Sequence, residues 1–191
     1  MIYLNHLTKT NKMNIVRGDL LDNSNNLNFI LQQLNCLCVK PHGLSKTISD
    51  KYPHGKIYEA RQKEYRRNLA VEKDRDDPGS VIVSFPSPSN KLRPIIIGLF
   101  GQYDFGKSYY KNNRPILDPP ESNQLREIWF QSCLNTFRNW LVDNNYDNDN
   151  TRIGLPYGIG CGLAGGNWNT YHPMIKNFEK EIKCQVILYK L

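Results

Sequence analysis

The chain has 191 residues, of which 39% are hydrophobic and 23% are charged, as in ordinary soluble globular proteins. This length suits a single domain, residues 1–191, and is enough to bury a core without metal ions or disulfides. No apolar run approaches the roughly 20 residues of a transmembrane helix, so we expect no membrane partner.

Positive charge exceeds negative charge, with 25 Lys and Arg against 18 Asp and Glu, for a net charge of +7. Such a balance suits nucleic acid, but also a smaller polyanion such as a pyrophosphate. One basic cluster, residues 61–67, is more typical of a solvated helix face. Because no aromatic array accompanies it on paired strands, a nucleic-acid partner is not favoured.

The sequence has no secretory signal and an odd number of cysteines, which predicts reduced thiols in the cytoplasm or nucleus. The five are Cys36, Cys38, Cys133, Cys161 and Cys184. Their spacings do not match a zinc site, so we expect neither a structural metal nor a cofactor. We also expect a monomer.

Hydrophobic patterning predicts strands that alternate with helices. The predicted strands are residues 1–7, 13–17, 29–35, 80–85, 94–100, 152–155 and 185–189. The predicted helices are residues 43–51, 58–69, a long helix that starts near a capping box of Asp118 and Glu121, and 171–181. The long helix carries a core stripe of Leu125, Trp129, Cys133, Phe137 and Trp140. This order predicts an α/β fold in which a mixed or largely parallel sheet lies between helical layers.

The most specific chemical signal is the glycine-rich segment 158–166, which follows a predicted strand and precedes a predicted helix. α/β sheets bind phosphates at such positions, and glycines let backbone N–H groups approach an anion closely. The alternative is a flexible turn. We favour a phosphate loop because ordering so many glycines for a mere connection is entropically costly. It is not a P-loop, since no Gly-Lys-Ser/Thr follows.

Two weaker signals accompany this loop. Gly43, Leu44 and Ser45 open a predicted helix, and a helix N-terminus attracts anions. Two such N–H sources could grip a pyrophosphate from opposite sides. Asp19 follows a predicted strand and could accept a hydrogen bond from an exocyclic amine, although alone it is more typical of a turn.

Several segments resemble a macrodomain, in macrodomain order: NIVRGDLL at 14–21, LNC at 34–36, HGLS at 42–45, KYP at 51–53 and IGCGLAGGNW at 159–168. LFGQ at 99–102 and the final LYKL are similar to the branch that contains ADP-ribose-1″-phosphate phosphatase and the terminal ADP-ribose protein glycohydrolase. The resemblance implies one three-layer α/β/α domain with a mixed, largely parallel sheet of about six strands.

The same resemblance implies a site for ADP-ribose or an ADP-ribosylated macromolecule. Asp19 and Leu20 would bind adenine, and Asn35 would lie near the distal ribose. The diphosphate would contact Gly43, Leu44, Ser45, Gly158, Ile159, Gly160, Cys161, Gly162 and Leu163.

Several positions depart from the branch. The glycohydrolase lysine corresponds to Gln102 and the aspartate after its Gly-Cys-Gly-Leu motif to Ala164, while the phosphatase histidine corresponds to Gln32 and Asn167 stands where relatives carry aspartate. An amide cannot replace the lysine as nucleophile. His42 and Asn35 remain the catalytic candidates, His42 as general acid or base. The sequence thus predicts an ADP-ribose-binding hydrolase that acts at the distal ribose. The alternative is a non-catalytic reader of ADP-ribosylated protein or nucleic acid.

Overall fold

A computed structural model describes residues 13–22, 25–65, 67–89, 94–108 and 114–191. The six strands of its sheet are β1 (Asn14–Arg17), β2 (Phe29–Asn35), β3 (Val81–Ser84), β4 (Ile95–Gln102), β5 (Arg152–Pro156) and β6 (Gln185–Lys190). They lie in the order β1-β6-β5-β2-β4-β3. Neighbouring strands are parallel except at one edge, where β3 pairs antiparallel with β4.

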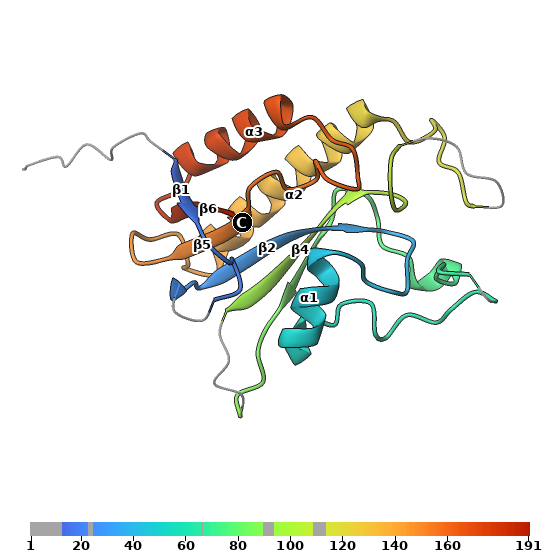
Figure 1. The fold of residues 1–191 in the computed structure, drawn as a ribbon, viewed down its shortest axis with the longest axis horizontal. Helices are drawn as coiled ribbons and strands as arrows, with labels where there is room; N and C mark the ends of the chain where they lie inside the picture. Colours follow the sequence, from blue (N-terminus) through green and yellow to red (C-terminus); the bar gives the residue numbers. More distant parts are fainter. Residues whose placement is uncertain (1–12, 23–24, 66, 90–93, 109–113) are drawn as a thin grey trace, which may run out of the picture.

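The helices form a layer on each face of this sheet (Figure 1). α1 (Leu44–Lys51) lies on one face, while α2 (Asn123–Asp143) and α3 (Trp168–Lys180) lie side by side on the other. Two short 3-10 turns, Pro53–Gly55 and Glu72–Asp74, follow α1. The predicted α/β fold, with a mixed and largely parallel sheet of six strands between helical layers, is confirmed.

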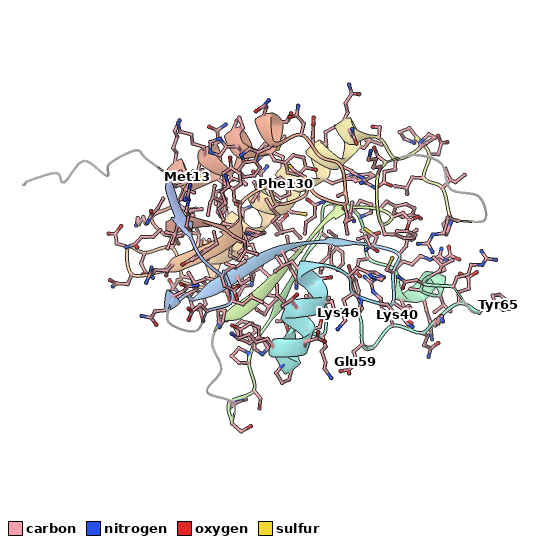
Figure 2. All side chains as sticks on the ribbon, viewed as in Figure 1. Met13, Lys40, Lys46, Glu59, Tyr65 and Phe130 are labelled. Carbon is pink, nitrogen blue, oxygen red and sulfur yellow. The ribbon has the colours of Figure 1, made fainter. Side chains whose placement is uncertain are left out.

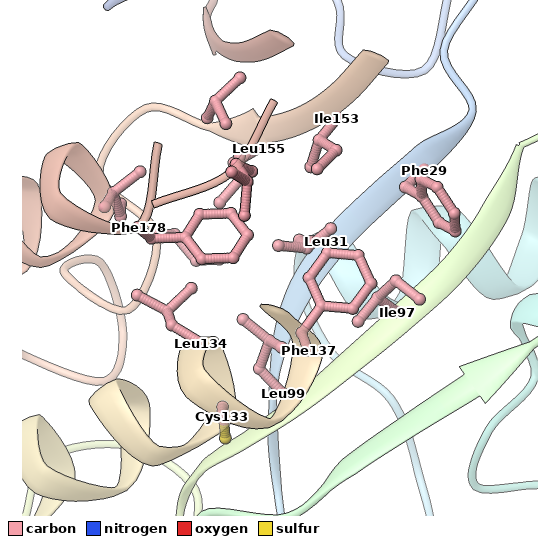
Figure 3. Packing of buried hydrophobic residues seen from close by; sticks show 14 of the residues in the cluster. Phe29, Leu31, Ile97, Leu99, Cys133, Leu134, Phe137, Ile153, Leu155 and Phe178 are labelled. Carbon is pink, nitrogen blue, oxygen red and sulfur yellow. The ribbon is translucent and has the colours of Figure 1, made fainter. Parts of the chain in front are cut away.

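The main core fills the space between the sheet and the α2–α3 layer (Figure 3). Phe29 and Leu31 of β2 meet Phe137 of α2 there, and all three are fully buried. A smaller core lies between the sheet and α1, where Ile30 packs with Ile48. β2 is therefore apolar on both faces, as a central parallel strand must be. Side chains of the outer surface, such as Lys46 of α1, project into solvent (Figure 2).

The predicted helical stripe is confirmed in part: Cys133 and Phe137 are fully buried and Trp140 packs against the core, but Leu125 and Trp129 are only half-buried. The buried face of α2 consists of Arg126, Phe130, Cys133, Leu134, Phe137 and Leu141. The predicted capping box is wrong. Ser122 caps α2 instead, with its hydroxyl accepting a hydrogen bond from the Leu125 N–H at 3.1 Å.

The predicted helix at residues 58–69 is also wrong, because tertiary contacts override the local pattern there. The guanidinium of Arg61 turns inward to pair with Asp76, and the chain folds back so that Lys63 bridges Ala70. The basic cluster therefore does not lie on a helix face.

The last predicted helix is confirmed but begins earlier, at Trp168, because the Asn167 side chain accepts a hydrogen bond from the Asn169 N–H. The predicted strand at residues 1–7 lies outside the described residues. In the described part of the chain, no helix is both long and apolar enough to cross a bilayer.

Candidate functional site

The site arises where two neighbouring parallel strands separate. β2 and β5 pair through Phe29–Ile153 and Ile30–Gly154, and then diverge toward their carboxyl ends. The chain leaves β2 for α1 on one face and leaves β5 for α3 on the other. Crevices at such a switch point are the usual ligand sites of open α/β sheets.

A cavity of about 310 Å³ occupies this divergence. Its walls come from the segment that opens α1, the loop after β5 and the loop after β4, and its floor comes from β2 and β4. The lining residues are Gln32, Gln33, Asn35, His42, Gly43, Leu44, Ser45, Tyr58, Gln102, Phe105, Gly106, Pro156, Gly158, Ile159, Gly160, Gly162, Leu163 and Ala164.

The first wall is the N-terminus of α1. Gly43 is its N-cap, with φ 55°, and no side chain of the described residues forms a capping hydrogen bond with the first turn. The hydroxyl of Ser45 is already used locally, because it donates to the His42 carbonyl at 2.8 Å and accepts from the His42 N–H. The N–H groups of Leu44 and Ser45 have no partner within the helix, and they are the donors that this wall can offer to an anion.

The second wall is the glycine-rich loop. Gly158 and Gly160 have φ of 77° and 73°, which are conformations that glycine adopts without strain. A Cβ on Gly160 would lie 2.4 Å from Gln33 Oε1, whereas one on Gly162 would meet nothing within 4 Å. The local packing and backbone conformation therefore require a glycine at position 160, whereas a side chain at position 162 would enter open space.

This loop also presents hydrogen-bond donors. No described residue accepts a hydrogen bond from the N–H groups of Gly160, Gly162, Leu163 and Ala164. Because this wall and the α1 N-terminus border one cavity, the crevice offers neutral backbone donors from both sides.

Three glutamines, Gln32, Gln33 and Gln102, are among the residues of β2 and β4 that line the cavity. Gln33 Nε2 donates to Gln102 Oε1 at 2.9 Å. This contact depends on a register shift between β2 and β4, in which Gln33 lies opposite Leu99 but Asn35 lies opposite Gln102. Without the extra residue in β4, Gln102 would point to the other face of the sheet.

One buried arginine joins the two loops that form the walls. Arg126 of α2 is 1% exposed and pairs with Glu121 at 2.8 Å. Its guanidinium also donates to the carbonyls of Gly106 and Asp104 in the loop after β4, and to that of Ala164 in the glycine-rich loop. Arg126 therefore fixes the spacing between two walls of the cavity.

A second arginine supports the segment that leads into α1. Arg114 pairs with the buried Asp104 and donates to the Asn68 carbonyl at 2.9 Å. The Asn68 side chain in turn accepts hydrogen bonds from the N–H groups of Val39 and Lys40. The loops around the crevice are therefore linked through buried guanidinium groups.

The two catalytic candidates both border the cavity. Asn35 uses Oδ1 to accept from the Cys38 N–H at 2.8 Å, so its amide NH₂ is the group that can meet a ligand. His42 is exposed, with Nε2 3.5 Å from Asn68 Nδ2.

Titratable groups are few among the lining residues. Beside His42 there is Tyr58, whose hydroxyl exchanges hydrogen bonds with the Asn35 backbone and whose pKa is raised by burial. Among the residues that the structure describes, no Lys, Asp, Glu or Cys side chain lines the cavity. In the described residues, no group of three metal-ligating side chains could hold a metal ion.

Three of the predicted ligand-binding residues lie outside the lining. Asp19 is exposed beyond the end of β1, where Oδ1 accepts from the Leu21 N–H at 2.9 Å, and Leu20 beside it is buried. Cys161 turns its thiol toward the Ile159 carbonyl, and burial raises its pKa to about 11.

Sequence reasoning missed several residues of the site. Gln33 had no signal, because an isolated glutamine in a strand looks the same whether or not it faces a cavity. Phe105 and Gly106 lie in the long polar loop after β4, whose length was itself a signal of function. Arg126 lies within a helical stripe and could not be told from a surface arginine.

The fold has known counterparts. The macrodomain of DarG from Thermus aquaticus is 16% identical, with a TM-score of 0.61 over 94% of this chain and 97% of that one. A protein of unknown function from Bacteroides thetaiotaomicron is 18% identical, with a TM-score of 0.58 over 94% of this chain and 98% of that one. The alphavirus P23pro-zbd is 10% identical, with a TM-score of 0.55 over 93% of this chain and 22% of that one.

These likenesses define the chain as a protein with the macrodomain fold. Neither a family model nor a curated protein matches the sequence.

The Arg126 linkage leads to a stability prediction. Arg126→Leu should lower the free energy of unfolding by about 3 to 5 kcal/mol, because it leaves the carboxylate of Glu121 buried without its partner. Urea unfolding measures this loss. Asp50→Ala is the control, since it breaks the exposed Lys46–Asp50 pair and should cost under about 1 kcal/mol. Equal losses for the two variants would contradict the role given to Arg126.

Proposed function

We propose that the crevice binds ADP-ribose and that the protein is a binding module for this ligand or for ADP-ribosyl groups on a macromolecule. The observation that carries the proposal is the pair of facing N–H sources, one at the α1 N-terminus and one in the glycine-rich loop. Together they can hold both phosphates of a pyrophosphate. The macrodomain fold shared with DarG supports the same ligand class.

The dimensions of the sheet support a dinucleotide-sized ligand. Asp19 follows β1 and Gln102 ends β4, and these strands are separated by four strand spacings. At 4.8 Å for each spacing, the two residues are at least about 19 Å apart across the sheet, because β5 and β2 also diverge between them. A ligand that contacts both must extend well beyond a mononucleotide, as ADP-ribose does.

We propose that Asp19 is the adenine-binding residue at the β1 end. Its Oδ1 accepts a backbone hydrogen bond, but a carboxylate retains further lone pairs for an exocyclic amine. The exposure of Asp19 leaves room for a base beside it. Asn35 and the glutamines that line the cavity are then left for the distal ribose.

Hydrolysis at the distal ribose is the second candidate function, and one observation favours it: the exposed imidazole of His42 borders the cavity. The branch resemblance suggests phosphate or a protein side chain as leaving group. However, the cavity is lined by Gln102 and Gln32 where nucleophilic or acid–base groups are needed. We therefore propose a reader rather than a hydrolase.

The glycine-rich loop provides the sharpest test of ligand binding. Gly162→Glu should abolish ADP-ribose binding, measured by calorimetry, because its side chain enters open space and brings negative charge against the diphosphate. Thermal unfolding should change little. Gly162→Ala is the matched control and should keep both stability and binding. A folded Gly162→Glu protein that binds ADP-ribose normally would exclude this loop as the phosphate site.

Gly160→Ala separates a structural glycine from a ligand-facing one. It should lower stability by about 1 to 3 kcal/mol, because φ is positive and the new Cβ would collide with Gln33 and Tyr171. A melting temperature unchanged from that of Gly162→Ala would contradict this distinction.

For the adenine end, Asp19→Ala should weaken ADP-ribose binding by about 1.5 to 3 kcal/mol, because it removes a charge-assisted hydrogen bond. Ribose-5-phosphate, which has no base, should lose no affinity in the same titration. An unchanged dissociation constant for ADP-ribose in the folded variant would show that Asp19 only stabilises the turn after β1 and does not bind adenine.

Turnover is tested by incubating the protein with ADP-ribose-1″-phosphate and with ADP-ribosylated protein while release of phosphate and ADP-ribose is followed. We expect no release above that in the absence of protein. Release that disappears in His42→Ala would instead make the chain a hydrolase with His42 as its acid or base.

A further inference from the structure

We infer that a row of aromatic rings on the α3 side of the sheet binds the bases of a single-stranded nucleic acid, while basic residues beside it contact the phosphates. The rings belong to Tyr157, Trp168 and His172, and none of these residues lines the crevice. The inference does not depend on ADP-ribose binding, because it concerns another surface and a polymeric ligand.

The three rings come from two segments and lie next to one another. The ring centroids of Tyr157 and Trp168 are 4.7 Å apart, and those of Trp168 and His172 are 5.2 Å apart. Trp168 and His172 are four residues apart in α3, so they occupy the same face of the helix. Trp168 is half-buried and packs against the main core, whereas Tyr157 is 36% exposed. The row is therefore anchored in the protein and open to solvent at Tyr157.

Basic side chains lie beside the Tyr157 end of the row. The N–H of Tyr157 donates to the Tyr189 carbonyl, which extends the pairing of β5 with β6 by one residue and places Tyr157 next to Lys190. The Lys190 ammonium lies over the Tyr157 ring, 5.0 Å from its centroid. Lys190 in turn is paired in register with Arg17 of β1. One ring and two cations thus lie in a line across the ends of β5, β6 and β1.

Strand alternation places these three side chains on the α3 side of the sheet. Successive residues of a strand point to opposite faces, so residues two or four apart share a face. Residues of the main core, which lies between the sheet and the α2–α3 layer, occur at those separations from Tyr157, Lys190 and Arg17: Leu155, Leu188 and Met13. The rings of α3 and the cations of the sheet therefore belong to one surface.

The positive charge of this surface is not balanced locally. Lys176 lies one turn beyond His172 on α3, and Arg17, Lys176 and Lys190 are all exposed. None of the three forms an ion pair with a residue that the structure describes. The first acidic residue of α3 is Glu179, in its last turn. Exposed rings beside unpaired cations suit a ligand that carries both negative charge and flat π surfaces.

Single-stranded nucleic acid has this combination. Its phosphates pair with lysine and arginine, and its unpaired bases stack on aromatic rings with little regard to sequence. The bases of a duplex are already stacked on one another and are less accessible to the rings. An acidic peptide would satisfy the cations but would leave the rings without stacking partners. Residues 61–67 lack such rings, which the fold instead gathers beside Lys190 and Arg17.

The test is fluorescence anisotropy of the native protein with a labelled oligothymidylate of about ten nucleotides. Thymine has no exocyclic amine, so the proposed adenine site at Asp19 does not recognise it. We expect saturable binding, at least about tenfold tighter than that of a duplex of the same length, and no displacement by saturating ADP-ribose. Absence of binding, equal binding of the duplex, or displacement by ADP-ribose would each overturn the inference.

Two variants separate the stacking from the charge. Tyr157→Ala should weaken oligothymidylate binding about tenfold, because it removes the exposed stacking ring. Lys190→Gln should reduce the slope of log K against log salt concentration by about 0.7, which is the contribution of one phosphate contact on a single strand. Both side chains are exposed, so the melting temperatures should change little.

Tyr65→Ala is the matched control. Tyr65 is 85% exposed and lies far from β6 and α3 (Figures 1 and 2), so loss of its ring should leave oligothymidylate affinity unchanged. If folded Tyr157→Ala binds as tightly as Tyr65→Ala, the rings do not stack on bases and the inference fails. A salt dependence in Lys190→Gln equal to that of the native protein would likewise exclude the phosphate contact.

Discussion

The geometry of the crevice depends on one buried cation. The Arg126 guanidinium lies where α2, the loop after β4 and the glycine-rich loop meet, and it pairs with Glu121 while donating to three loop carbonyls. Glu121 also accepts from the Tyr103 N–H at 2.6 Å. Loop carbonyls in a protein interior must find donors, and a guanidinium supplies five in a fixed plane. Polar contacts thus order the crevice walls together with the packing of Ile159 in the main core, which explains how glycine-rich and polar loops can hold a defined shape.

The interior of the site is neutral in spite of the charged groups behind it. Its donors include backbone N–H groups and amides, and two carboxylates behind its walls, Asp104 and Glu121, are paired with Arg114 and Arg126. Backbone donors can hold a diphosphate without lysine or arginine, because they are fixed in direction and need no reorganisation. A site built this way can recognise a ligand by its hydrogen-bonding pattern, and this supports the binding role that we propose.

Sequence patterns could predict the fold because its strands and helices carry strong periodic signals. β2 and β4 both begin with apolar runs, and the glycine-rich segment lies between a strand and a helix. Sequence patterns could not predict the region after α1, where Arg61 turns inward to Asp76. Pairing between charged residues far apart in the sequence does not change the hydrophobic periodicity of either segment. The pairing of two glutamines in the cavity lining was hidden for a related reason. The contact between Gln33 and Gln102 depends on one extra residue in β4, and a register shift between strands far apart in sequence cannot be read from either strand alone.

The net charge of +7 bears on how fast an anionic ligand reaches the protein, more than on contacts inside the cavity. No lysine or arginine of the described residues lines the crevice, so the basic side chains that the structure describes act on it at longer range. Such a field attracts an anionic ligand and raises the association rate, and it is screened over about 8 Å at physiological salt. Contacts inside the crevice are short and shielded, so they determine dissociation and selectivity. In the proposed binding, the basic surface would increase encounters with an anionic ligand, and contacts in the crevice would determine how long it remains bound.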